Sequence, residues 1–243
     1  NDGKKELVQS RLSKRMIALK INSFDEYLSK AEKDRNEFSQ MIDSLTTNKT
    51  SFFRENQHFD FLRNRILPTI ATKRLRIWSS ACSSGEEPYS ISILLNEAIP
   101  NFERWDARIL ATDISSHVLT KARNGIYSDE VLSVMQNDVR SKYFTPLNTQ
   151  PKTFAISEKI KKPISFARIN LMAEWQMKGF FDVIFCRNVM IYFDKETQYR
   201  ILKKFVPLLA PDGLLFAGHS ESFQHAIDLF KLREKTVYEL AKK

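Results

Sequence analysis

The sequence predicts an α/β protein in which a small all-α domain precedes a doubly wound, mostly parallel sheet. Residues 1–65 contain a single glycine and no proline, and their apolar residues recur at helical spacing. From Leu75 onward, short apolar runs alternate with helical stretches, which is typical of parallel strands buried on both faces. We therefore expect a helical domain with its linker over residues 1–65 and a sheet domain over residues 66–243.

The helical domain is expected to consist of amphipathic helices. Apolar residues at helical spacing mark their buried faces: Leu7, Val8, Leu12, Met16, Leu19, Phe24, Tyr27 and Leu28. Ser23 stands three residues before Glu26, a capping-box pattern that predicts a helix start. After this domain, Asn48, Thr50 or Ser51 is expected to cap a junction helix.

The strands of the sheet domain are expected in a regular order. The parallel strands are the runs "IWSSA", "RILATD", "ISFARI" and "DVIFC", each followed by a helix or a turn. Helices are expected at 88–98, within "HVLTKAR" and within "ETQYRILKKFVPLL", and the last of these precedes the strand "GLLFAGH". The final stretch, "FKLREKTVYELAKK", alternates in the manner of strands and suits an antiparallel edge hairpin.

Composition narrows the class of protein. The chain has 243 residues, 42% of them hydrophobic, which suffices for a full core. No apolar run approaches the roughly 20 residues that span a bilayer, so we expect no membrane insertion and a cytoplasmic location. Cys82 and Cys186 lie in strand-like runs and are expected to be buried thiols, and the histidines lack metal-ligand spacing, so no metal is expected. The formal charge of +9 indicates an acidic partner: nucleic acid, anionic lipid or protein.

Polar residues follow each expected parallel strand. They are Ser83 to Glu87 after the first, Asp113 after the second, Asn170 after the third, and Arg187 with Asn188 after the fourth. In open sheets of this kind the ligand lies outside the carboxyl ends of the strands. We therefore expect these side chains to converge on one crevice.

The stretch "SSACSSGEEPYS" identifies the kind of ligand. Pro88 suits the first turn of a helix, so Gly85, Glu86 and Glu87 are expected to form the turn before it. Two adjacent acids would repel a pyrophosphate, which argues against a dinucleotide. S-adenosylmethionine fits better, because it has no phosphate and carries a sulfonium and an ammonium group. Glu87, favoured over Glu86, is expected to bind the ammonium group.

The other strand-end residues suit the remaining parts of the same ligand. Asp113 lies 26 residues beyond Glu87, close to the offset at which a second-strand acid binds ribose hydroxyls. Asn170 and Asn188 are expected to hydrogen-bond the adenine edge or the methionine portion. The alternative is that these polar residues only cap strands and helices, which is less favoured for all of them together.

An arginine stands at the junction of the two domains, in "TTNKTSFFRENQHF". Phe52 and Phe53 are expected to pack between the domains. Arg54, directly behind them, is either a surface ion pair or a clamp for a carboxylate in the cleft.

The sequence resembles the chemotaxis receptor methyltransferases of the CheR type over nearly its whole length. The motifs that carry the resemblance are "LTTNKTSFFRE", "WSSACSSGEEPYS", "ATDISSHVLTKAR", "FDVIFCRNVMIYFD" and "GLLFAGHSES". The resemblance implies a Rossmann-like methyltransferase sheet. It also implies that S-adenosylmethionine donates a methyl group to glutamate side chains on the cytoplasmic helices of chemoreceptors, which yields glutamate methyl esters and S-adenosylhomocysteine in sensory adaptation.

The resemblance also implies roles for residues around the cofactor. From the side of the small domain, Asn48, Thr50 and Arg54 are implied to reach it. Glu87 is implied to bind the methionine end and Asp113 the ribose.

Further roles are implied along the last two parallel strands. Asn170 and Leu171 are implied to surround the adenine, and Asn188 and Val189 to lie near the reacting sulfur. Arg54 and Tyr192 are the residues that the family places closest to the transferred methyl group, and we expect them to orient the substrate carboxylate.

The sequence departs from the family in two places. The leading helical domain looks short at its start, so a first helix is expected to be missing or trimmed. The family can carry a small β insertion that grips the C-terminal tail of a receptor, and we expect the insertion at about residues 143–167. That segment contains no glycine, so binding of a receptor tail is not expected.

The basic leading helices are expected either to contact acidic receptor surface or to form a solvated face. The protein is expected to be a monomer.

Two rival functions share this fold and cofactor. A nucleic-acid methyltransferase would typically place an Asn/Asp-Pro-Pro-aromatic motif after the fourth strand, but that position reads "RNVMIYF", without proline. No nucleic-acid partner is therefore expected. A non-catalytic cofactor sensor is the second rival, and the presence of Arg54, Glu87, Asp113 and Tyr192 argues against it.

Overall fold

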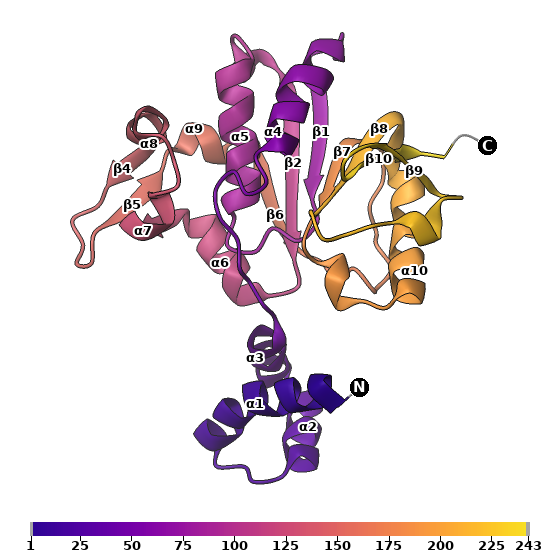
Figure 1. Cartoon of the computed structure of the whole chain (residues 1–243). Coiled ribbons are helices and arrows are strands. Elements are labelled where there is room, and N and C mark those ends of the chain that lie inside the picture. The colour runs from indigo at the N-terminus through magenta and orange to yellow at the C-terminus, as the bar shows by residue number, and fades with distance from the viewer. Residues whose placement is uncertain (1, 242–243) are drawn as a thin grey trace.

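The computed structural model describes residues 2–241, which form a small helical domain at one end of a larger sheet domain (Figure 1). The helices are α1 (Asp2–Leu19), α2 (Phe24–Lys33), α3 (Arg35–Leu45), α4 (Gln57–Phe61), α5 (Glu86–Ala98), α6 (Ser116–Asn124), α7 (Asp129–Leu132), α8 (Asn137–Tyr143), α9 (Glu158–Lys161) and α10 (Lys195–Phe205). The strands are β1 (Arg74–Ser79), β2 (Asp106–Asp113), β3 (Ile126–Ser128), β4 (Phe144–Pro146), β5 (Thr153–Ile156), β6 (Ile164–Arg168), β7 (Phe181–Cys186), β8 (Leu209–Ala217), β9 (Phe230–Glu234) and β10 (Val237–Leu240). None of the described helices is long and apolar enough to cross a bilayer.

The expected helical domain is present as α1, α2 and α3. Its buried core consists of Leu12, Met16, Ile21 and Tyr27. The helix start predicted at Ser23 is confirmed, because Ser23 is the N-cap residue of α2, but its side chain makes no capping hydrogen bond. The side chain of Asp34 caps the following helix, α3, by accepting two backbone N–H groups.

The main sheet confirms the predicted doubly wound architecture. Its strand order is β6-β2-β1-β7-β8-β10-β9. The pairs among β6, β2, β1, β7 and β8 are parallel, whereas β10 runs antiparallel to both β8 and β9 and so forms the expected edge hairpin. The order reverses between β1 and β7, and a crevice outside the carboxyl ends of these two strands is where such sheets bind ligands.

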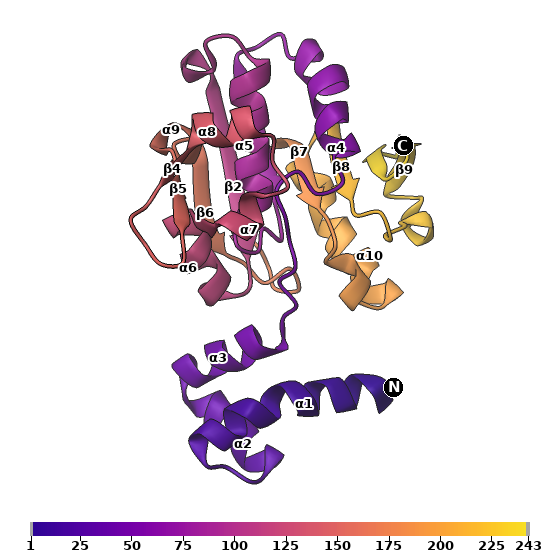
Figure 2. The ribbon, with the colours of Figure 1, turned by 60° about the vertical axis from the view of Figure 1, so that its left-hand side comes forward.

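The central strand β1 is buried on both faces of the sheet, because its successive side chains point to opposite sides and helices cover both. Ile77 packs with Leu94 of α5, and Trp78 packs with Phe205 of α10. Figures 1 and 2 show α4 and α5 on one face of the sheet and α10 on the other. Phe59, in α4, belongs to the same hydrophobic core as Ile77, so α4 packs with the sheet domain. The sheet domain therefore includes residues that precede the expected boundary at residue 65.

The predicted β insertion is present as a small antiparallel sheet with the order β3-β5-β4. Its strands occupy residues 126–156, so it begins before the expected residue 143. It projects from the side of the main sheet, next to α7 and α8 (Figures 1 and 2).

The linker at residues 46–56 differs from the sequence prediction. It contains no helix, so Asn48, Thr50 and Ser51 cap none. Phe52 does not pack between the domains. Its ring packs against the ring of Phe144 in the β insertion, with centroids 5.5 Å apart. Phe53 packs against Phe59, with centroids 5.3 Å apart. The linker turns back onto the sheet domain through positive φ angles of 52° at Phe53 and 57° at Glu55, which helical propensity does not reveal.

Candidate functional site

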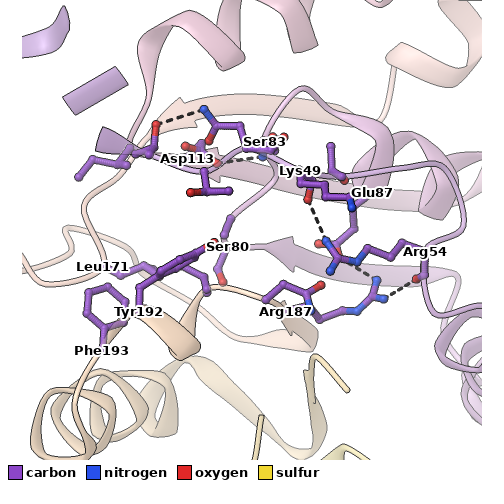
Figure 3. Close-up of a pocket in the computed structure, with 18 of the residues that line it drawn as sticks. Lys49, Arg54, Ser80, Ser83, Glu87, Asp113, Leu171, Arg187, Tyr192 and Phe193 are labelled. Carbon is purple, nitrogen blue, oxygen red and sulfur yellow. Dashed lines mark hydrogen bonds and ion pairs between the residues drawn. The ribbon is translucent and has the colours of Figure 1, made fainter. Parts of the chain in front are cut away.

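A cavity of about 350 Å³ lies between the helical domain and the carboxyl ends of the parallel strands (Figure 3). Leu7, Arg11 and Leu45 reach it from the helical domain. The structure brings all of the residues selected from the sequence together on its wall: Asn48, Thr50, Arg54, Glu87, Asp113, Asn170, Leu171, Asn188, Val189 and Tyr192. Lys49, Ser80, Ser83, Arg187 and Phe193 also line it.

The loop after β1 places Glu87 on the cavity wall. Gly85 caps α5 with a φ of 99°, and a Cβ atom there would lie only 2.9 Å from the Cβ of Ala122, so the position requires glycine. The helix begins at Glu86 rather than at Pro88, and the two acids therefore belong to its first turn, not to the preceding turn. Glu86 is buried and does not line the cavity, and the hydroxyl of Ser84 donates to its carboxylate, with Oγ 3.0 and 2.8 Å from the two oxygens.

Glu87 is held by two side chains. Ser79 Oγ donates to its Oε1 at 2.7 Å, and Arg187 Nη1 lies 2.9 Å from its Oε2. Burial raises the pKa of Glu87, and the positive charge of Arg187 opposes that shift. Sequence reasoning noted Arg187 at a strand end but did not select it as a site residue. An arginine directly after the apolar run "FDVIFC" was the available signal.

Asp113, at the end of β2, presents a buried carboxylate. Its oxygens accept backbone N–H groups from Ser83 and Ser115, each at 2.9 Å. Burial raises the pKa of Asp113, and these hydrogen bonds act in the opposite direction. The contacts fix the orientation of the carboxylate at the cavity wall.

The loops after β6 and β7 complete this side of the cavity. Asn170 Oδ1 accepts the backbone N–H of Met172 at 2.9 Å, which shapes the turn that carries Leu171. Asn188 has a positive φ of 59°. The carboxylate of Glu221 accepts the backbone N–H groups of Asn188 at 2.9 Å and of Met190 at 2.7 Å, so it holds this loop in place. Sequence reasoning did not select Glu221.

Arg54 and Tyr192 enter the cavity from opposite sides (Figure 3). Arg54 belongs to the linker, and its Nη1 donates to the carbonyl oxygen of Lys49 at 2.8 Å. Tyr192 belongs to the turn after β7 and is half exposed. The linker is attached to the sheet domain by Ser83 Oγ, which donates to the carbonyl oxygen of Asn48 at 3.0 Å.

A buried histidine lies behind the cavity. His58 is 1% exposed, its Nε2 lies 2.8 Å from Thr236 Oγ1, and its Nδ1 lies 3.5 Å from Glu55 Oε2. Burial, and after it the charge of Arg187, lowers the pKa of His58 to about 3. The ring is therefore neutral in the folded protein over most of the acidic range.

This lowered pKa predicts acid sensitivity. Below pH 6.5 His58 becomes protonated in the unfolded chain, whereas in the folded chain it stays neutral until about pH 3. The contribution of His58 to the free energy of unfolding is therefore fully present above pH 6.5 and is lost as the pH falls towards 3. The loss attributable to His58 should approach about 1.4 kcal/mol per pH unit. Urea unfolding of wild type and His58→Gln between pH 7.5 and 4 measures it. If the free energies of unfolding of the two proteins fell in parallel, the prediction would be wrong.

Two family models together match the chain. Residues 1–46 match the all-alpha domain of CheR methyltransferase, and residues 48–239 match its SAM-binding domain. The chain belongs to the CheR methyltransferase family. Curated relatives include chemotaxis protein methyltransferase 2 of Pseudomonas aeruginosa, which is 44% identical over 98% of this chain and 85% of the relative. The chemotaxis protein methyltransferase of Escherichia coli is 44% identical over 99% of this chain and 85% of the relative.

Membership in the CheR family confirms the resemblance found in the motifs and makes the chain an S-adenosylmethionine-dependent methyltransferase. The cavity suits that ligand in volume, since small-molecule sites typically occupy about 300–1,000 Å³. The carboxylates of Glu87 and Asp113 suit cationic and hydroxyl groups, and buried Leu171 offers an apolar contact. The roles of individual residues remain predictions.

Proposed function

We propose that this CheR-family protein transfers methyl groups to glutamate side chains on the cytoplasmic domains of chemoreceptors, and so acts as a protein-glutamate O-methyltransferase in the cytoplasm. The observation that carries the proposal is the placement of Arg54 and Tyr192 on opposite sides of a cavity that also contains Glu87 and Asp113 (Figure 3). The names of the relatives, chemotaxis protein methyltransferases, support a receptor of this class as the acceptor.

The cavity wall divides into donor-binding and acceptor-orienting residues. Bound S-adenosylmethionine supplies a methyl group on a positively charged sulfur, and S-adenosylhomocysteine is the product. Glu87 would bind the ammonium group and Asp113 the ribose hydroxyls. Asn170 and Leu171 would contact the adenine.

The remaining wall residues would lie around the reacting groups. Asn188 and Val189 would line the methionine portion near the sulfur, and Asn48 and Thr50 would approach from the linker. Arg54 and Tyr192 would orient the acceptor carboxylate.

The proposed chemistry requires no general base. A glutamate side chain with an ordinary pKa of about 4.3 is already ionised at pH 7 and can act as the nucleophile directly. The protein must then align the carboxylate with the methyl group, and such positioning can supply about 7–11 kcal/mol of the barrier reduction. Arg54 has the guanidinium geometry for orienting a carboxylate.

Labelled S-adenosylmethionine distinguishes this acceptor from its rivals. The protein is incubated with receptor cytoplasmic fragments, with and without their C-terminal tail peptide, or with nucleic acid. We expect alkali-labile label on both receptor fragments at rates within about two-fold, because a methyl ester hydrolyses in base and tail binding is not expected. Label on nucleic acid alone would overturn the proposal, and a rate that fell strongly without the tail would show that the insertion binds it.

A further inference from the structure

One buried guanidinium joins three segments that meet at the cavity wall. Arg187 directly follows β7, and its side chain is 2% exposed. Its Nη1 lies 2.9 Å from Glu87 Oε2 in the first turn of α5. Its Nη2 lies 3.1 Å from Glu55 Oε2 and donates to the carbonyl oxygen of Arg54, both in the linker. Figure 3 shows Arg187 between Glu87 and Arg54.

Glu55 holds this guanidinium from the linker side. Its side chain is 8% exposed, and its Oε1 accepts from Asn188 Nδ2 and from the backbone N–H of His219, each at 3.2 Å. Burial works against ionisation, yet the charge of Arg187 and these hydrogen bonds lower the pKa of Glu55. The two carboxylates of Glu55 and Glu87 therefore share one cation.

We propose that Arg187 is a positioning residue, held by Glu55, that fixes both Glu87 and the main chain of Arg54 on the cavity wall. The inference rests on the proposed function of Arg54 and Glu87, since neither residue is shown to contact a ligand. It assigns to Arg187 and Glu55 the task of setting the distance between the donor-binding part of the wall and the acceptor-orienting part.

The linker needs such a restraint because its backbone is strained on both sides of Arg54. Phe53 and Glu55 adopt left-handed φ angles of 52° and 57°, a conformation that costs free energy in residues other than glycine. The hydrogen bond of the Arg54 side chain goes to Lys49 of the same linker, so it does not attach the linker to the sheet. Arg187 supplies that attachment directly at the Arg54 peptide.

The geometry also explains why arginine occupies position 187. A guanidinium presents several N–H donors in a rigid plane, and here two nitrogens contact groups on different segments. A lysine ammonium in the same place would keep the charge but would lack the planar fork. Arg187→Lys therefore separates charge from geometry, and Glu55→Gln removes one carboxylate while leaving the pairing of Arg187 with Glu87 intact.

The test measures binding and turnover separately for wild type, Arg187→Lys and Glu55→Gln. Calorimetry gives the Kd for S-adenosylmethionine, label transfer to receptor fragments gives kcat and KM, and thermal melting checks the fold. Arg76→Lys is the matched control, because Arg76 also forms a short ion pair, with Asp106 at the amino end of β2, and neither residue lines the cavity.

We expect Glu55→Gln to change the Kd less than about three-fold but to lower kcat about 10- to 100-fold, because a misplacement near 1 Å can cost about 100-fold. Arg187→Lys should raise the Kd about ten-fold and lower kcat about 100-fold, and Arg76→Lys should match wild type. Variants with a lower melting temperature but wild-type kcat and Kd at temperatures where they are folded would overturn the inference. Arg187 and Glu55 would then serve only the stability of the fold. If wild type labelled no receptor, the proposed acceptor would be wrong, and an unchanged Kd in Arg187→Lys would still overturn the inference.

Discussion

Replacing Arg54 with alanine is expected to lower the rate of methyl transfer about 100-fold or more while the Kd for S-adenosylmethionine rises less than about ten-fold. The reason is that the guanidinium is proposed to orient the acceptor carboxylate, an interaction that counts mainly during transfer. A 100-fold loss corresponds to about 2.7 kcal/mol of transition-state stabilisation. Calorimetric binding and label transfer to receptor fragments measure the two quantities on the same preparations.

The fold should tolerate the Arg54→Ala substitution. The hydrogen bond of its side chain goes to the carbonyl oxygen of Lys49 within the same linker, and Phe52 and Phe53 keep the linker packed on the sheet domain. Arg65→Ala is a suitable control, because Arg65 is an exposed arginine outside the residues that line the cavity. Full transfer activity in Arg54→Ala would remove the proposed role of this residue.

Replacing Asp113 with alanine is expected to raise the Kd for S-adenosylmethionine about 100-fold or more. The substitution removes the carboxylate proposed to accept the ribose hydroxyls, and it also leaves the backbone N–H groups of Ser83 and Ser115 without this acceptor. Each unsatisfied buried donor costs about 1–3 kcal/mol, so the loop after β1 should also loosen. Calorimetry with S-adenosylmethionine and with S-adenosylhomocysteine gives the change in Kd.

Two further variants make the Asp113 result interpretable. Asp113→Asn keeps one carbonyl oxygen and should bind with an intermediate Kd, about 10- to 30-fold above wild type, since it loses only part of the acceptor capacity. Asp106→Ala changes the same residue type at the amino end of the same strand and should leave the Kd unchanged. A wild-type Kd in Asp113→Ala would contradict the proposed ribose contact.

Strand-end reasoning predicted much of the cavity wall before any fold was known. Glu87, Asp113, Asn170 and Asn188 each follow a parallel strand, and such strands present their carboxyl ends at one edge of the sheet. The runs that form these strands are short and apolar, so their positions follow from local pattern. The residues that follow these strands can therefore be expected to lie near one another even when the order of the strands in the sheet is unknown.

The partners of these residues could not be predicted in the same way. Arg187 is separated from Glu87 by 100 positions in the sequence, and from the Arg54 carbonyl by 133. No local pattern marks which of many charged residues will meet at that separation. The same is true of Glu221, whose carboxylate shapes the loop at Asn188 from another part of the chain.

The sequence by itself determined the doubly wound sheet, the helical domain before it and the strand-end polar residues Glu87, Asp113, Asn170 and Asn188, because hydrophobic periodicity and strand-end position are local properties. Only the tertiary structure decided the course of the linker. The left-handed turn at Phe53 and Glu55 is not a local preference of those residues, and the packing of Phe52 and the ion pair of Glu55 with Arg187 stabilise it. That turn places Arg54 at the cavity instead of on a junction helix.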